Sequence, residues 1–212
     1  MTDSLTTLIG KIQTILGDDG TIFTTATCTA AVRQALSDFN RAVPQILALT
    51  ITGINNQLVY ELSDEDENAV SILDVLLQGE NDADVSITYD AYTEDERIFF
   101  RLLHPVTDSD TLLVRYTANH TINGLDSEVE STILAKDDQI IVDGAAYQAV
   151  YTRATSRVES INLSKDQSDN YREVASHFKN AFLLGIKNAA RRRLPSGEPD
   201  SRAWNDIYHH WN

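Results

Sequence analysis

Apolar residues recur at helical spacing in four stretches of the chain, two near each end. An apolar side chain at every third or fourth position places all of them on one helix face. Glycines that form turns follow the first stretch, and Pro44 follows the second, where it disfavours helical geometry in the preceding residue. The pattern predicts helices at residues 4–16, at residues 29–42, from about residue 136, and at residues 165–193.

The two C-terminal helices have distinct sequence features. The first carries a stripe of small side chains that includes Gly144, Ala145 and Ala149, which lets a neighbouring backbone approach closely and predicts burial in a bundle. The second begins among acids and ends in Arg191-Arg192-Arg193, the charge order that the helix dipole favours. Two interpretations of this triplet are open: a solvated helix end, or a basic patch that docks on an acidic partner.

Between the helical stretches the hydrophobic pattern changes to short, β-branched runs. A hairpin is predicted from residues 45–52 and 57–62, joined by a turn at Asn55-Asn56. Residues 70–77 are too short and too apolar for their pattern to separate a strand from a buried helix. With further strands at 85–92, 97–103 and 111–117, the region holds five or six strands in meander order.

These elements predict an α+β fold in four segments. The four helices form a bundle, an antiparallel β-rich subdomain is inserted between the two helical pairs, and the chain ends in an extended arm. Proline and glycine mark residues 195–200 as a linker. The expected segments are the first helical pair, the acidic β-rich insert, the second helical pair and the arm, at residues 1–44, 45–125, 126–194 and 195–212.

The 212 residues carry a net charge of −15 that is unevenly distributed. No Lys or Arg lies between Arg41 and Arg97, whereas thirteen acidic residues do. Tight DNA binding relies on many basic contacts with phosphates, so this chain is a poor candidate for gripping DNA. It remains able to surround DNA without holding it.

No motif in the sequence predicts catalysis, a cofactor or a metal. The single cysteine, Cys28, excludes an intrachain disulfide and a multi-cysteine zinc site, and is expected to be a small buried residue. The acidic run at 64–67 lacks the order of a calcium loop, and the adjacent His209 and His210 lack supporting carboxylates. The N-terminus has no signal-peptide pattern and no apolar run is long enough for a membrane span, so we expect synthesis in the cytoplasm and no membrane.

The last residues carry an unusual share of aromatic surface, because both tryptophans lie within the final nine positions. Tryptophan and tyrosine are enriched at the centres of protein interfaces, and a chain end normally frays. The segment either folds back onto its own domain or docks onto another subunit. Its candidate docking residues are Arg202, Trp204, Ile207, Tyr208 and Trp211.

The order of these parts, and three phrases in particular, are similar to a known family. The second predicted helix reads AVRQALSDFNRAVP (31–44), and a later strand reads TLLVRYTANHT (111–121) before Ala145-Ala146-Tyr147 on a helix. The end of the chain contains DSRAW (200–204). Together these phrases resemble the head-to-tail adaptor, or connector, proteins of tailed bacteriophages. The acidic insert is longer than in the smallest such adaptors.

The resemblance implies a non-enzymatic virion protein, made in the host cytoplasm and located at the head–tail junction. It would form a dodecameric ring of identical subunits under the portal protein, extend the DNA channel, and offer a platform to a neck or tail protein on the distal side. The C-terminal arm would dock on the portal, and an acidic lumen would let DNA slide past. The alternatives are another neck subunit or a tail completion or terminator subunit, and an α+β enzyme or ligand-binding domain using carboxylates such as Glu61 or Asp90.

Overall fold

The computed structural model describes residues 3–62, 68–78, 84–95, 97–158 and 165–193. It confirms the α+β class: four helices and seven strands in antiparallel sheets lie within these ranges. The chain divides into two compact units, a helical unit (Met1–Val43 with His120–Asn212) and a β unit (Pro44–Asn119). No helix in the described part of the chain combines the length and apolarity that crossing a membrane requires.

The first two helices begin at hydroxyl caps. Helix α1 (Leu5–Ile15) starts where the Ser4 hydroxyl accepts a hydrogen bond from the Thr7 N–H. Its C-cap is Leu16, and Gly17, with a φ of 64°, turns the chain away directly afterwards. Helix α2 (Thr25–Ala42) begins earlier than the predicted residue 29, because Thr24 caps it by accepting from the Thr27 N–H. The threonine-rich start of α2 has no apolar periodicity, so the pattern missed it.

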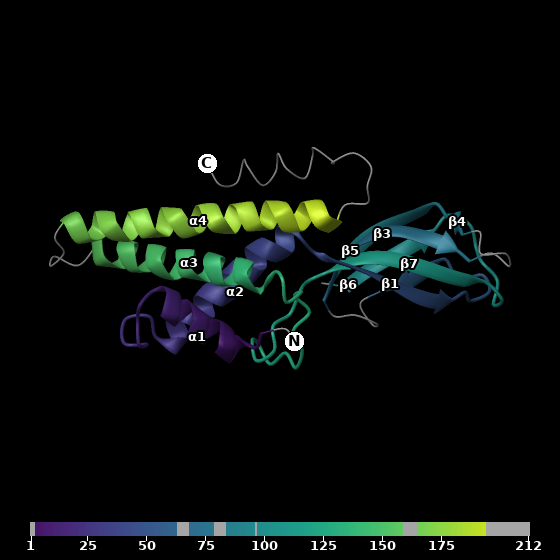
Figure 1. The fold of residues 1–212 in the computed structure, drawn as a ribbon. Helices are drawn as coiled ribbons and strands as arrows, with labels where there is room; N and C mark the ends of the chain where they lie inside the picture. Colours follow the sequence, from purple (N-terminus) through teal and green to yellow (C-terminus); the bar gives the residue numbers. More distant parts are fainter. Residues whose placement is uncertain (1–2, 63–67, 79–83, 96, 159–164, 194–212) are drawn as a thin grey trace. The chain divides into compact units, whose positions relative to one another are not determined.

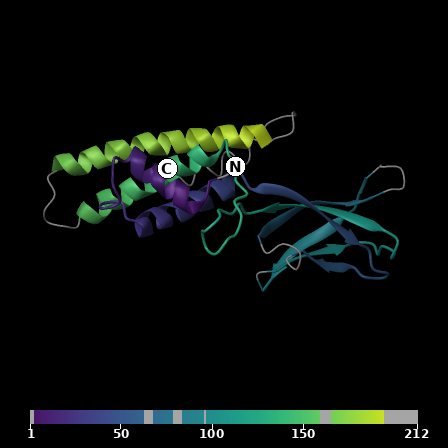
Figure 2. The same ribbon diagram turned by 60° about the horizontal axis from the view of Figure 1, so that its bottom comes forward.

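The third and fourth helices, α3 (Asp138–Val158) and α4 (Lys165–Arg193), lie side by side (Figures 1 and 2). Glycines set their separation. A Cβ atom at Gly144 would lie 2.7 Å from the Phe182 ring, and one at Gly185 would lie 2.9 Å from the Ile140 side chain. The small residues of α3 therefore permit close packing, as their sequence predicted.

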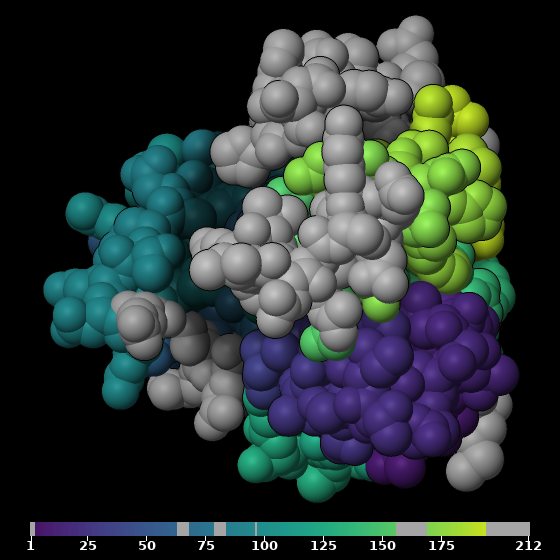
Figure 3. Space-filling model, turned by 90° about the vertical axis from the view of Figure 1, so that its left-hand side faces the viewer, coloured from purple at the N-terminus to yellow at the C-terminus, as the bar shows by residue number. Residues whose placement is uncertain are grey.

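The core of the helical unit draws on all four helices. Phe39 of α2, Ile141 of α3 and Phe182 of α4 are fully buried in it, as is Cys28, whose buried position confirms the sequence prediction. Helices α1 and α2 form one continuous block of the unit's surface (Figure 3). Helix α3 packs against each of the other three and is the central element.

The β unit consists of two antiparallel sheets that share one apolar core. The larger sheet has the order β1-β7-β3-β4, formed by Gln45–Thr52, Thr111–Ala118, Ala69–Leu77 and Val85–Ser86. The smaller sheet has the order β2-β6-β5, formed by Val59–Glu61, Arg97–Leu102 and Tyr89–Glu94. Alternate side chains of β6 and β7, such as Phe100 and Val114, fill the core.

The predicted hairpin of residues 45–52 and 57–62 is wrong, and so is the meander order. Strand β1 pairs with β7, whereas β2 pairs with β6 in the other sheet. The chain changes sheets at Gly53, whose N–H donates to the Asp110 carbonyl (2.8 Å). A Cβ atom on Gly53 would lie 2.4 Å from the Thr107 carbonyl, so glycine is required for this close approach. Nonlocal pairing of this kind leaves no signal in periodicity.

The single strand predicted at residues 85–92 is also split between the sheets. The Ile87 N–H donates to Val75 in the larger sheet, and the Leu103 N–H donates to Thr88 in the smaller one. The run therefore supplies β4 and β5, one to each sheet. An uninterrupted alternation of apolar residues cannot reveal such a crossing, since Ile87 and Tyr89, on either side of it, pack against the same core.

Charge is divided between the units as unevenly as along the chain. The β unit holds fifteen of the 32 acidic residues but only three of the 17 basic ones, which gives it a net charge of −12. The helical unit accounts for the remaining −3. A net charge of −12 on the β unit attracts basic groups and repels phosphates.

Candidate functional site at the end of the last helix

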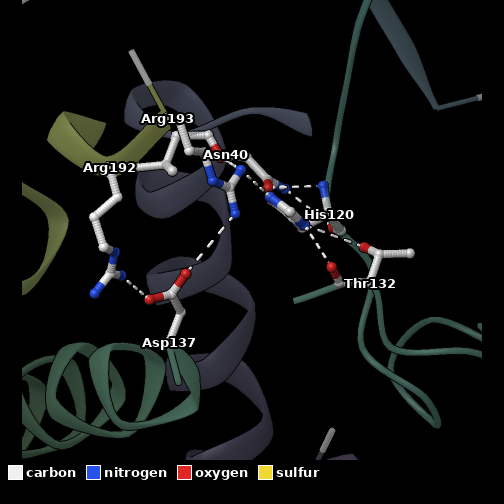
Figure 4. Close-up of polar contacts among 7 residues, drawn as sticks. Asn40, His120, Thr132, Asp137, Arg192 and Arg193 are labelled. Carbon is white, nitrogen blue, oxygen red and sulfur yellow. Dashed lines mark hydrogen bonds and ion pairs between the residues drawn. The ribbon is translucent and has the colours of Figure 1, made fainter. Parts of the chain in front are cut away.

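The arginine triplet ends α4, and its three members have different surroundings. Arg191 is exposed. Arg192 forms an ion pair with the Asp137 carboxylate, and an Arg193 guanidinium nitrogen lies 3.9 Å from the same carboxylate (Figure 4). Asp137 immediately precedes α3 and its side chain is only 1% exposed. Two of the three arginines thus neutralise a buried acid of their own unit, a contact that neither interpretation of the sequence anticipated.

Arg193 makes further contacts within the helical unit, with Val43, His120 and Phe39. Its guanidinium donates to the Val43 carbonyl (3.1 Å), lies 2.8 Å from Nε2 of His120, and is 6.0 Å from the centre of the Phe39 ring. Burial lowers the pKa of Arg193, and the Asp137 charge opposes that change. Arg193, the last described residue, therefore links the end of α4 to Val43 and His120.

His120 is held in one protonation state by its neighbours. A guanidinium can only donate hydrogen bonds, so Nε2 of His120 must accept from Arg193, and Nδ1 carries the proton towards the Thr132 carbonyl (3.2 Å). Burial, and then the positive charge of Arg193, lower the pKa of His120 to about 4. Its main chain is fixed too, because Asn40 exchanges two hydrogen bonds with the His120 N–H and carbonyl.

Val43, His120, Asp137, Arg192 and Arg193 together form a cluster. It lies where three connections leave the helical unit. Val43 is the last residue before the β unit, His120 is the first residue after it, and Arg193 directly precedes residues 194–212. Arg193 contacts both of the others. The arrangement is suited to fixing chain ends. The Thr132 hydroxyl lies 3.2 Å from His120, but it faces Nδ1, the ring nitrogen that carries the proton and therefore cannot act as a base towards it.

The sequence identified the three arginines as a candidate site but did not predict which residues they contact. No sequence pattern singles out Asp137, and His120 appears only within the strand phrase at residues 111–121. An acid before a helix that proves almost fully buried has no distinctive sequence signal. The candidate docking residues Arg202, Trp204, Ile207, Tyr208 and Trp211, together with the acidic run at 64–67, lie outside the described residues.

The carboxylates considered for an enzymatic alternative do not converge. Glu61 on β2 pairs with Arg97 (3.3 Å), and Asp90 on β5 faces Arg101. Because β6 separates these two strands, the acids lie on opposite edges of the smaller sheet. Among the described residues, no three His, Cys, Asp or Glu side chains are grouped as a metal site requires.

Comparison with known proteins gives structural likenesses only. No protein-family model matches the sequence, and no curated protein matches it. Among solved structures, a chain in the neck of an empty gene transfer agent (GTA) particle, computed with C6 symmetry, is 11% identical with a TM-score of 0.31, covering 90% of this chain and 92% of that one. A chain in the virion of the native GTA particle is 11% identical with a TM-score of 0.33, covering 92% of each chain.

A third chain, from the neck of the native GTA particle computed with C12 symmetry, is 14% identical with a TM-score of 0.31 and covers 94% of this chain and 97% of that one. All three belong to particle necks or virions. At TM-scores this low, the likeness carries no argument about the fold or function of the present chain.

Proposed function

We propose that the chain is a structural subunit of the head–tail junction of a tailed phage or prophage particle. It assembles as a dodecameric ring beneath the portal, extends the DNA channel and presents a platform to a neck or tail protein. The sequence phrases at residues 31–44 and 111–121 support this assignment, since they resemble those of head-to-tail adaptors. The proposed role is structural and non-enzymatic.

The observation that carries the proposal is the anchored end of α4. Arg192 pairs with the buried Asp137, and Arg193 contacts Val43 and His120. The position from which residues 194–212 continue is therefore fixed. That segment holds both tryptophans. A fixed base improves docking because less conformational freedom is lost when the arm binds. We assign the arm to the portal, with Trp204 and Trp211 as anchors and Arg191 as an exposed member of the triplet for an acidic partner.

The charge of the β unit fits a channel component. A net charge of −12 on this unit repels DNA phosphates and removes the basic contacts that would hold the duplex. A ring of such subunits lets DNA pass without specific binding. The protein therefore acts in the virion as a conduit and a connector.

The test is assembly with the portal protein of the same phage or prophage. Native mass spectrometry and class averages of the mixture are expected to show a ring of this chain stacked on the portal ring. A monomer in isolation is compatible with the proposal, because the portal can template the ring. Failure to bind the portal, with ring formation on a tail tube instead, would identify a tail completion or terminator subunit.

A further inference from the structure

The free edges of the two sheets differ in how they are protected. An exposed strand edge is a template for another chain, and proteins usually blunt it with short strands, bulges or charges. Strand β2 has three residues, β4 has two, and β5 carries Asp90 and Glu94. Where β4 leaves β3 uncovered, two register shifts interrupt β3. Strand β1 has none of these features.

Strand β1 is long, regular and uncharged. Its eight residues, QILALTIT, contain no charged residue and no proline, and they pair with β7 in an unbroken register from Gln45↔Ala118 to Thr52↔Thr111. It is the end strand of its sheet. On the solvent face its side chains are Ile46, which is 51% exposed, followed by Ala48, Thr50 and Thr52.

The hydrogen-bond pattern identifies which main-chain groups face outwards. The Gly53 N–H donates to Asp110 at the end of β7, and the Thr111 carbonyl instead accepts from Gln78 next to β3. Neighbouring residues of a strand point their N–H and C=O groups in opposite directions. The odd-numbered residues of β1 therefore bond to β7, and the even-numbered ones point away from it. Within the described part of the chain, Ile46, Ala48, Thr50 and Thr52 have no partner on that side.

Either a second copy of this chain or a strand of a different protein could pair with β1, and charge distinguishes the two. A second copy would bring another β unit of net charge −12 against the first. Pairing two copies along this edge would bring two units of the same sign side by side, so their charges repel each other. Asp108 and Asp110 lie beside the Gly53 end of the edge. A strand with basic flanks is attracted to the same surface.

We propose that β1 is a β-addition site for an extended segment of a partner protein, an uncharged strand of alternating β-branched residues flanked by Lys or Arg. The main-chain groups of the four even-numbered residues hold the added strand, and Ile46 and Ala48 contact its alternate side chains. This site belongs to the β unit alone. It stands or fails independently of the ring and the portal.

A variant pair separates the edge from the fold. Ala48→Pro removes one outward N–H and places a ring against the incoming strand, while the bonds from β1 to β7 remain. Ala48→Val keeps the N–H and enlarges the same side chain, so it is the matched control. Leu49→Pro removes an inward N–H and is expected to disrupt the sheet, which checks the register by circular dichroism.

The probe is a fluorescein-labelled peptide of alternating threonine and valine with a lysine pair at each end, measured by fluorescence anisotropy. It is expected to bind the full-length protein, to bind Ala48→Pro at least about ten-fold more weakly, and to bind Ala48→Val within about two-fold. A twin peptide with glutamate pairs is expected to bind at least about ten-fold more weakly than the lysine form. Equal binding by wild type and Ala48→Pro, equal binding of both peptides, or no binding to wild type would overturn the proposal.

Amide exchange tests the same site without a variant. By residue-resolved NMR, the amides of Ile46, Ala48 and Thr50 are expected to exchange quickly in the free protein and slowly with the lysine peptide, whereas Leu47 and Leu49 stay protected throughout. Protection of the even-numbered amides in the free monomer would show that the chain already covers this edge. Light scattering that finds a dimer lost in Ala48→Pro would assign the edge to a second copy instead.

Discussion

Lowering the pH is expected to destabilise the helical unit through His120. The pKa of this histidine is about 4 in the folded protein and 6.5 in the unfolded chain, because the native site is buried and places Arg193 at 2.8 Å. Between these values the unfolded state binds a proton that the native state does not. Stability is therefore fully present above pH 6.5 and falls as the pH decreases towards 4, by about 1.4 kcal/mol per pH unit.

The expected loss from this one group is about 2 kcal/mol between about pH 7 and pH 5. Buried carboxyls act in the opposite sense. Burial raises the pKa of Asp38, Asp138 and Asp143, so the native state takes up their protons more readily and gains stability as the pH falls. The pH dependence of the wild type alone therefore cannot isolate His120. The difference between wild type and His120→Gln removes the carboxyl contributions common to both proteins.

The assay is urea unfolding followed by far-ultraviolet circular dichroism, which reports on the helices. His120→Gln is expected to be less stable than wild type at neutral pH and to lose that disadvantage as the pH approaches about 5. His104→Gln, which removes an exposed histidine of the loop after β6, is the matched control for losing one imidazole. Parallel stability curves for wild type and His120→Gln across this range would refute the assigned contact with Arg193.

Three further predictions concern the packing and the arm. Asp137→Ala leaves the arginines at the end of α4 without their buried acid and is expected to destabilise the protein by about 1–3 kcal/mol in the same urea assay, and an unchanged midpoint would contradict the cluster. Gly144→Ala places a methyl group 2.7 Å from the Phe182 ring and is expected to cost about 1–3 kcal/mol. The control is Gly10→Ala, whose new Cβ atom meets nothing within 4 Å; it is expected to be neutral or stabilising, and equal effects of the two variants would disprove tight packing at α3. Deleting residues 199–212 is expected to abolish binding to portal rings and leave the circular dichroism spectrum unchanged, so unchanged portal affinity would eliminate the arm as the docking element.

Local features of the chain were predictable where local physics controls them. The last helix spans Lys165–Arg193, as its periodicity predicted, and α2 stops before Pro44 as expected. The glycines and alanines of α3 predicted a tightly packed helix, and Gly144 against Phe182 provides the contact. The candidate docking residues in the terminal arm remain predictions from composition.

The amino-acid sequence alone determined the number and type of the main helices, the β-rich character of the middle region and the division of charge, because these depend on periodicity, caps and composition. Only the tertiary structure decided which strand pairs with which, that β1 is the end strand of its sheet, that Arg192 and Arg193 pair with Asp137, and that Arg193 contacts His120. Those outcomes join residues far apart in the chain. Pairing and burial depend on what the rest of the fold places opposite each residue, and no local pattern records that.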